Sequence, residues 1–166
     1  MAILWDALDD YFATELLAEM GADGDYLTLQ LQDVTINDDW KVEDAIRNNV
    51  FPLGIVRTLA VEEDAGEHGS FGDTGKTRVV NQYGYVIITV TVAEDRDICR
   101  QQIRTMRSRV LSFLRARPSC GGLIGDDGER VRRILFDTTI PRMFNAGNVS
   151  AFYGITETYF AVETKG

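Results

Sequence analysis

The chain has 166 residues, 45% of them hydrophobic and 26% charged, which is typical of a folded soluble protein with one core. Its longest uninterrupted apolar run, Met1 to Trp5, is too short to cross a bilayer, which excludes a membrane span. The 26 acidic and 17 basic residues give a formal net charge of −9, which opposes the wrapping of nucleic acid around the chain.

The first half of the chain predicts two helices and two strands ahead of an acidic loop. Residues 3–20 carry apolar side chains every three or four positions, the pattern of an amphipathic helix. Alternation over Tyr26–Gln32 predicts a half-buried strand or an extended segment. Residues Trp40–Arg47 predict a short helix, and the many β-formers of Leu53–Val61 predict a further strand. Residues 62–77 hold four glycines and five acidic residues with almost no apolar side chain, which predicts a flexible loop.

The second half predicts three strands and the longest helix. Arg78–Val92 alternates as a strand, and Glu94 to about Arg115 has a buried helical stripe. Two further strands, Glu129–Thr139 and Ser150–Thr164, are joined by a turn over residues 140–149, where Pro141 and Gly147 stand. Because helices separate groups of hairpin-linked strands, we predict one α+β domain over residues 1–166. Its mostly antiparallel sheet packs with a long helix and an N-terminal helix.

No motif carries catalytic or metal-binding chemistry. One histidine, His68, and two separated cysteines, Cys99 and Cys120, are too few for a zinc site or a nucleophile with its base. The segment Gly72–Thr77 ends like a phosphate-binding loop, but it has Ser70 where that loop requires glycine, and acidic residues surround it. The aspartate pairs 23/25, 38/39 and 126/127 lack calcium-loop spacing and predict turns. We therefore expect no catalysis, no cofactor and no metal.

Charge is distributed unevenly along the chain. Residues 1–77 hold 17 acidic and four basic residues, a net of −13, whereas residues 78–166 hold nine acidic and 13 basic residues, a net of +4. Opposite faces of unlike charge would suit head-to-tail self-association that closes into a ring. The alternative is that these charges cancel within one solvated molecule.

A row of arginines on the predicted long helix is the most specific signal. Arg100, Arg104 and Arg107 share a face displaced from the apolar stripe, and Arg115 and Arg117 extend the charge. These guanidinium groups either solvate the helix or bind carboxylates of a neighbouring subunit, where bidentate geometry would align a ring. Nucleic acid is a third possibility, although few aromatic residues lie between the arginines to stack on bases.

Three segments in this order resemble the tail terminator, or tail completion, proteins of long-tailed bacteriophages. The segments are Asn81–Val90, which is a strand, Cys99–Leu111, which is a helix, and the closing strand Phe152–Val162. The similarity extends in pattern from Trp40 to Val162 and concerns architecture more than signature residues.

The resemblance implies a virion protein, assembled in the host cytoplasm, whose copies form a hexameric ring. Such a ring caps the polymerised tail tube, joins the tail to a neck or connector protein, and lets DNA pass without specific binding. An acidic wall would repel phosphates, so the acidic loop is our candidate for the tube-facing or lumen-facing surface. Its acidic residues are Glu62, Glu63, Asp64, Glu67 and Asp73. The candidate subunit interface comprises Arg100, Arg104, Arg107 and Arg115.

Two alternatives stay open at this point. The long loop after Val61 and the long N-terminal portion differ from a typical tail terminator, which leaves a head-tail connector or head-closure ring of the same neck. The other alternative is a small cytosolic enzyme or nucleotide-binding module built around Gly72–Thr77. The first residues lack a secretory signal, so we expect the chain to stay in the cytosol, with free thiols, until it assembles.

Overall fold

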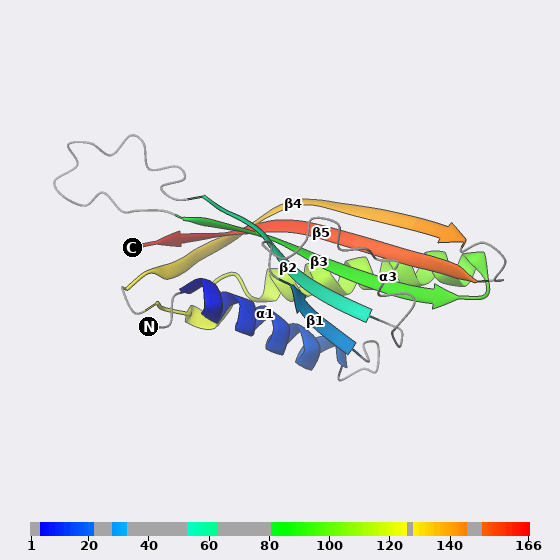
Figure 1. Cartoon of the computed structure of the whole chain (residues 1–166), viewed down its shortest axis with the longest axis horizontal. Coiled ribbons are helices and arrows are strands. Elements are labelled where there is room, and N and C mark those ends of the chain that lie inside the picture. The colour runs from blue at the N-terminus through cyan, green and yellow to red at the C-terminus, as the bar shows by residue number, and fades with distance from the viewer. Residues whose placement is uncertain (1–3, 22–27, 33–52, 63–80, 126–127, 146–150) are drawn as a thin grey trace.

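The computed structural model describes residues 4–21, 28–32, 53–62, 81–125, 128–145 and 151–166 (Figure 1). The predicted helix over 40–47, most of the acidic loop, the Gly72–Thr77 segment, His68 and the three aspartate pairs lie outside these ranges. The elements are α1 (Leu4–Gly21), β1 (Thr28–Gln32), β2 (Leu53–Glu62), β3 (Gln82–Ala93), α3 (Arg96–Ala116), the 3-10 turn η1 (Cys120–Gly122), β4 (Arg130–Asn145) and β5 (Phe152–Lys165).

The strands form one five-stranded sheet in the order β1-β2-β3-β5-β4. β1 pairs with β2 in parallel, and every other neighbouring pair is antiparallel. The α+β class with a mostly antiparallel sheet is therefore confirmed. The prediction of one domain over residues 1–166 includes undescribed residues and stays a prediction.

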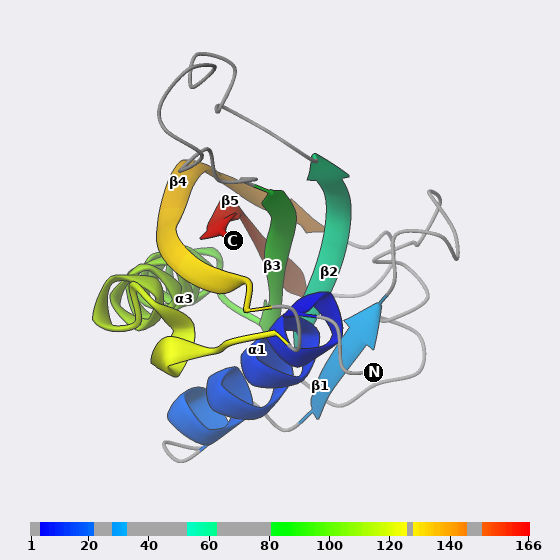
Figure 2. The ribbon, with the colours of Figure 1, turned by 90° about the vertical axis from the view of Figure 1, so that its left-hand side faces the viewer.

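Both helices lie on the same side of the sheet, α1 against β1 and β2, and α3 along β3 and β5 (Figures 1 and 2). The predicted stripe of α1 is buried at Leu4, Leu8, Phe12 and Leu16. Phe12 packs 5.0 Å from the ring of Tyr85 and 5.2 Å from that of Phe160, centroid to centroid. One core thus joins α1, α3 and the helix-facing side of the sheet.

The predicted turn over residues 140–149 is wrong in its first part. β4 continues to Asn145, so Ile140, Pro141 and Met143 pair with Glu157, Thr156 and Gly154 of β5. Proline lacks the N–H that a central strand needs, but β4 is the edge of the sheet and requires hydrogen bonds on one side only. Pairing with β5 therefore extends β4 past Pro141, although a proline usually ends a strand.

Gly154 sets how closely α3 approaches the sheet. A Cβ at this position would lie 2.6 Å from Cγ1 of Ile103 and 2.9 Å from Oγ1 of Thr91. Only a glycine lets the helix lie directly on β5 here. Neither of the described helices is long and apolar enough to cross a membrane.

Candidate functional site

The amphipathic pattern of α3 places its arginines outward. Seven residues of the helix are buried, and Ile103, Met106, Val110, Phe113 and Leu114 among them confirm the predicted stripe. Asp95 caps the helix, because its carboxylate accepts hydrogen bonds from the backbone N of Asp97 at 2.7 Å and of Ile98 at 3.2 Å. With this face held in the core, Arg100, Arg104 and Arg107 are exposed.

The exposed arginines border an open pocket between α3 and the C-terminal half of β4. We call it the Met143 pocket, and its volume is about 260 Å³. Its lining residues are Arg100, Ile103, Arg104 and Arg107 of α3 and Pro141, Arg142 and Met143 of β4. Apolar atoms form most of this lining, so four arginines surround an apolar floor.

A second pocket of about 210 Å³, the Phe136 pocket, lies between the C-terminal half of α3 and the first half of β4. Arg115 lines it together with Leu111, Leu114, Pro118, Arg133, Ile134 and Phe136. The two pockets follow the same helix and the same edge strand. We call this combined surface the α3–β4 surface, and all four predicted interface arginines lie on it.

A bulge in β4 decides which side chains reach this surface. Phe136 pairs with Phe160 and Thr138 with Tyr159, so Asp137 is an extra residue that reverses the alternation. Phe136 therefore lies on the helix side, 51% exposed, whereas Ile140 and Phe144 lie on the opposite side, 42% and 36% exposed. Phe144 stacks there on Tyr153, with ring centroids 5.4 Å apart.

The arginines differ in how they are paired. Arg100 lies 3.5 Å from the Asp97 carboxylate, a solvent-exposed pair that contributes about 0.3–0.5 kcal/mol at most. Arg117 points away from the pockets toward α1, where it binds Glu19 at 3.1 Å and covers the Phe113 ring at 4.3 Å. Within the described residues, no carboxylate lies within ion-pairing distance of Arg104 or Arg107. Arg100 and Arg117 are thus paired with carboxylates of the same molecule, whereas Arg104 and Arg107 can bind carboxylates of a partner.

The predicted loop residues are placed only in part. Glu62 is the last residue of β2 and pairs with Gln82 of β3, so it belongs to the sheet and the prediction that it lies in the loop is wrong. The strand extends one position further because β3 supplies a partner for it. Glu63, Asp64, Glu67 and Asp73 lie outside the described residues.

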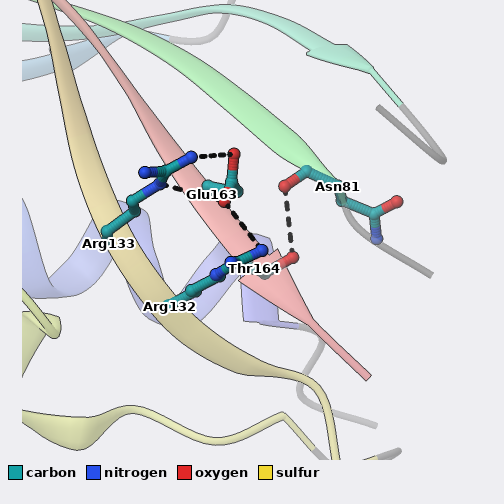
Figure 3. Close-up of polar contacts among 5 residues, drawn as sticks. All are labelled: Asn81, Arg132, Arg133, Glu163 and Thr164. Atoms are coloured by element: carbon teal, nitrogen blue, oxygen red, sulfur yellow. Dashed lines mark hydrogen bonds and ion pairs between the residues drawn. The ribbon is translucent and has the colours of Figure 1, made fainter. Parts of the chain in front are cut away.

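Three buried carboxylates were not singled out from the sequence. Glu163 of β5 is 5% exposed and binds Arg133 at 3.1 Å and Arg132 at 3.4 Å, both on β4 (Figure 3). Next to it, the backbone N–H of Thr164 donates to the Asn81 carbonyl at 2.9 Å, and the Thr164 hydroxyl lies 3.3 Å from the same oxygen, which joins β5 to the residue before β3 (Figure 3). Glu157 pairs with Arg142 and accepts a hydrogen bond from Tyr159 at 2.6 Å.

The third of these carboxylates, Glu129, accepts hydrogen bonds from the Asn81 amide at 2.8 Å, the Tyr83 hydroxyl at 3.2 Å and the Thr164 hydroxyl. These donors satisfy the buried Glu129 carboxylate, which thereby links the residue before β4 to β3 and β5. Glu163 lies directly opposite Arg133 of β4, whereas Glu157 lies opposite Ile140 and reaches Arg142 diagonally, so only the register of the two strands reveals these pairs.

The chemistry of the α3–β4 surface is that of a binding site for carboxylates with apolar neighbours. Guanidinium groups bind carboxylates with two parallel hydrogen bonds, and the apolar floor beside them gives a partner apolar surface to bury. Within the part of the chain that the structure describes, no three histidine, cysteine or acidic side chains are grouped as metal ligands would be.

Comparison with known proteins identifies no family for this chain. No family model matches it, and no curated protein matches it. Several solved structures match, among them a chain of the structure titled "Virion of native gene transfer agent (GTA) particle", in which the alignment covers 91% of this chain and 84% of that chain, at 12% identity and a TM-score of 0.42. A likeness this distant carries no argument about function.

Proposed function

We propose that this protein is a non-enzymatic structural subunit of a phage-like virion, which forms a ring and acts as a tail terminator. In this role, the ring caps the tail tube and joins it to a neck protein, with DNA passing through its channel. The order of elements that resembles the tail terminators suggested the proposal. The observation that carries it is the α3–β4 surface.

This surface has the composition of a protein interface. Arginine is enriched at the centres of interfaces, where it combines charge with an apolar stem. Here four arginines, Arg100, Arg104, Arg107 and Arg115, gather over two apolar pockets. Arginines that only solvate a helix need no pocket beneath them, so the arrangement favours docking over plain solvation.

The edge strand beneath the arginines favours docking through side chains. An open edge of 16 residues could pair with a strand of any other chain. Two register shifts and Pro141 interrupt β4, and these features oppose such pairing. A partner would therefore bind across the α3–β4 surface and leave the backbone of β4 unpaired.

Replacement of Arg100, Arg104 and Arg107 by Glu tests the proposal. We expect the purified wild type to form rings by negative-stain microscopy and to stop the growth of tubes made by the tail tube protein. The triple variant should form no rings and leave tubes of uncontrolled length, because like charges would face each other at the interface.

The matched control is Arg130→Glu, a reversal at an exposed arginine outside both pockets, which should assemble normally. Circular dichroism and thermal melting should show all variants folded. Rings that bind a neck protein but leave tube growth unchanged would reassign the protein to a connector or head-closure layer. Normal rings from the triple variant would assign the arginines to solvation, and a monomeric wild type would overturn the proposal.

A further inference from the structure

The outer face of α1 is acidic at two positions one helical turn apart. Asp6 and Asp10 are exposed, while Leu4, Leu8 and Phe12 hold the opposite face in the core. Asp9 differs, because its carboxylate accepts hydrogen bonds from the Tyr85 hydroxyl at 2.6 Å and the Thr58 hydroxyl at 3.0 Å. Among the described residues, no basic side chain lies within ion-pairing distance of Asp6 or Asp10.

The spacing of these two carboxylates matches that of two arginines on the α3–β4 surface. Asp6 and Asp10 are four residues apart on a helix, as are Arg100 and Arg104, and side chains at this spacing lie about 5–6 Å apart. Both pairs stand on helices whose other faces are packed, so their backbones are already ordered before contact. Two carboxylates can therefore meet two guanidinium groups at once.

We propose that the Asp6–Asp10 face of α1 in a second copy of this chain is the partner that docks on the α3–β4 surface, at Arg100 and Arg104. This inference rests on the proposed function, because it names the partner of the same surface. The two contacting surfaces are different parts of the molecule, because α1 lies against β1 and β2, whereas α3 lies along β3 and β5 (Figure 2). The contact is therefore head-to-tail, and repetition of it can close a ring.

Two oppositely charged variants of the full chain test this pairing. The first carries Arg100→Glu and Arg104→Glu, which makes both contacting surfaces acidic. The second carries Asp6→Lys and Asp10→Lys, which makes both surfaces basic. Each variant alone should associate at least about tenfold more weakly than the wild type by sedimentation velocity, because like charges would meet at every interface.

The equimolar mixture of the two variants is the decisive sample. At every contact in a mixed ring, an acidic surface would again meet a basic one, so the mixture should recover assemblies of wild-type size with alternating subunits. Recovery also shows that neither variant was misfolded. A chain that carries all four substitutions keeps the wild-type net charge and should assemble alone.

The outcomes separate this inference from the function on which it rests. If the wild type forms rings and the mixture does not recover them, or either variant assembles normally, the α1 partner is wrong and the ring function stands. If the wild type stays monomeric up to about 1 mM, both are overturned, since a ring-former has micromolar or tighter contacts. Arg130→Glu is again the control that should change nothing.

Discussion

Asp9 shows how one residue in a charged cluster can have a separate role. It stands between Asp6 and Asp10 in the first turns of α1, where acidic residues favour the start of a helix. In the structure, Asp9 faces inward and accepts hydrogen bonds from Tyr85 and Thr58, while Trp5 donates to the same threonine at 3.4 Å. Burial and the neighbouring Asp9 carboxylate raise the pKa of the Tyr85 hydroxyl, which keeps it protonated as a donor.

Cys120 leads to a prediction about alkaline pH. Its side chain is fully buried, and burial raises the pKa of the thiol from 9.0 to about 12. The unfolded chain releases this proton first as the pH rises. Stability from this group is therefore complete below pH 9 and is lost as the pH rises from 9 through about 12.

Cys120→Ala should flatten this alkaline loss. Between pH 9 and 10, the wild type should lose up to about 1.4 kcal/mol of unfolding free energy for this thiol that the variant does not lose. Urea unfolding at several pH values measures the slope for both proteins. Cys99→Ala, which keeps Cys120, is the comparison: burial also raises the pKa of the Cys99 thiol, but less, so this variant should remove less of the alkaline loss. Parallel curves for wild type and Cys120→Ala would contradict the assignment.

At the scale of elements, the contact between α3 and β5 determines the α3–β4 surface. Gly154 lets Ile103 approach the sheet, and Ile103 also forms part of the floor of the Met143 pocket. A change beneath the helix should therefore alter both the stability of the core and the arginine surface above it. Interiors packed this densely transmit small shifts.

Gly154→Ala should destabilise the protein by about 1–3 kcal/mol, because the new methyl group overlaps Ile103 and Thr91. Chemical denaturation measures the loss. In a background of Ile103→Ala, where the nearest overlapping atoms are removed, the same substitution should cost less. An equal cost in both backgrounds would mean that the contact with Ile103 does not limit this position. Self-association of the Gly154→Ala variant should also weaken, because α3 carries the arginines.

At the scale of the whole molecule, the two charged halves of the chain are neither fully separated nor fully cancelled. Arg117 of α3 binds Glu19 of α1, which joins the basic half to the acidic half within one molecule. Arg104 and Arg107 have no such partner among the described residues, and Asp6 and Asp10 have none either. The proposed head-to-tail contact would pair basic residues of α3 with these acidic residues of α1 in a neighbouring subunit.

Salt should therefore weaken self-association. Raising the salt from about 0.1 M to about 1 M shortens the screening length from about 10 Å to about 3 Å. We expect the dissociation constant of the wild type to rise at least about tenfold, measured by sedimentation at several concentrations. The variant with all four charges exchanged should respond similarly. Association that is unchanged or tighter at high salt would point to an apolar contact instead.

Much of the fold was predictable because its signals are local. The stripe of α1, the stripe of α3 and the alternation in β3 and β5 each follow from the burial of one face of a regular element. The arginine row of α3 was also visible, since residues three and four apart share a helix face. The proposed function needed this row and the order of elements.

The tertiary structure alone decided which segments far apart in the chain meet. β4 extends through Pro141 because β5 pairs with it, and the bulge at Asp137 turns Phe136 toward α3. No local pattern shows that Met143 and Arg142 lie beside Arg104, or that Asp9 turns away from Asp6 and Asp10. Local propensity and periodicity depend on neighbours in sequence, whereas pockets, edges and unpaired charges depend on contacts that exist only after the chain has folded.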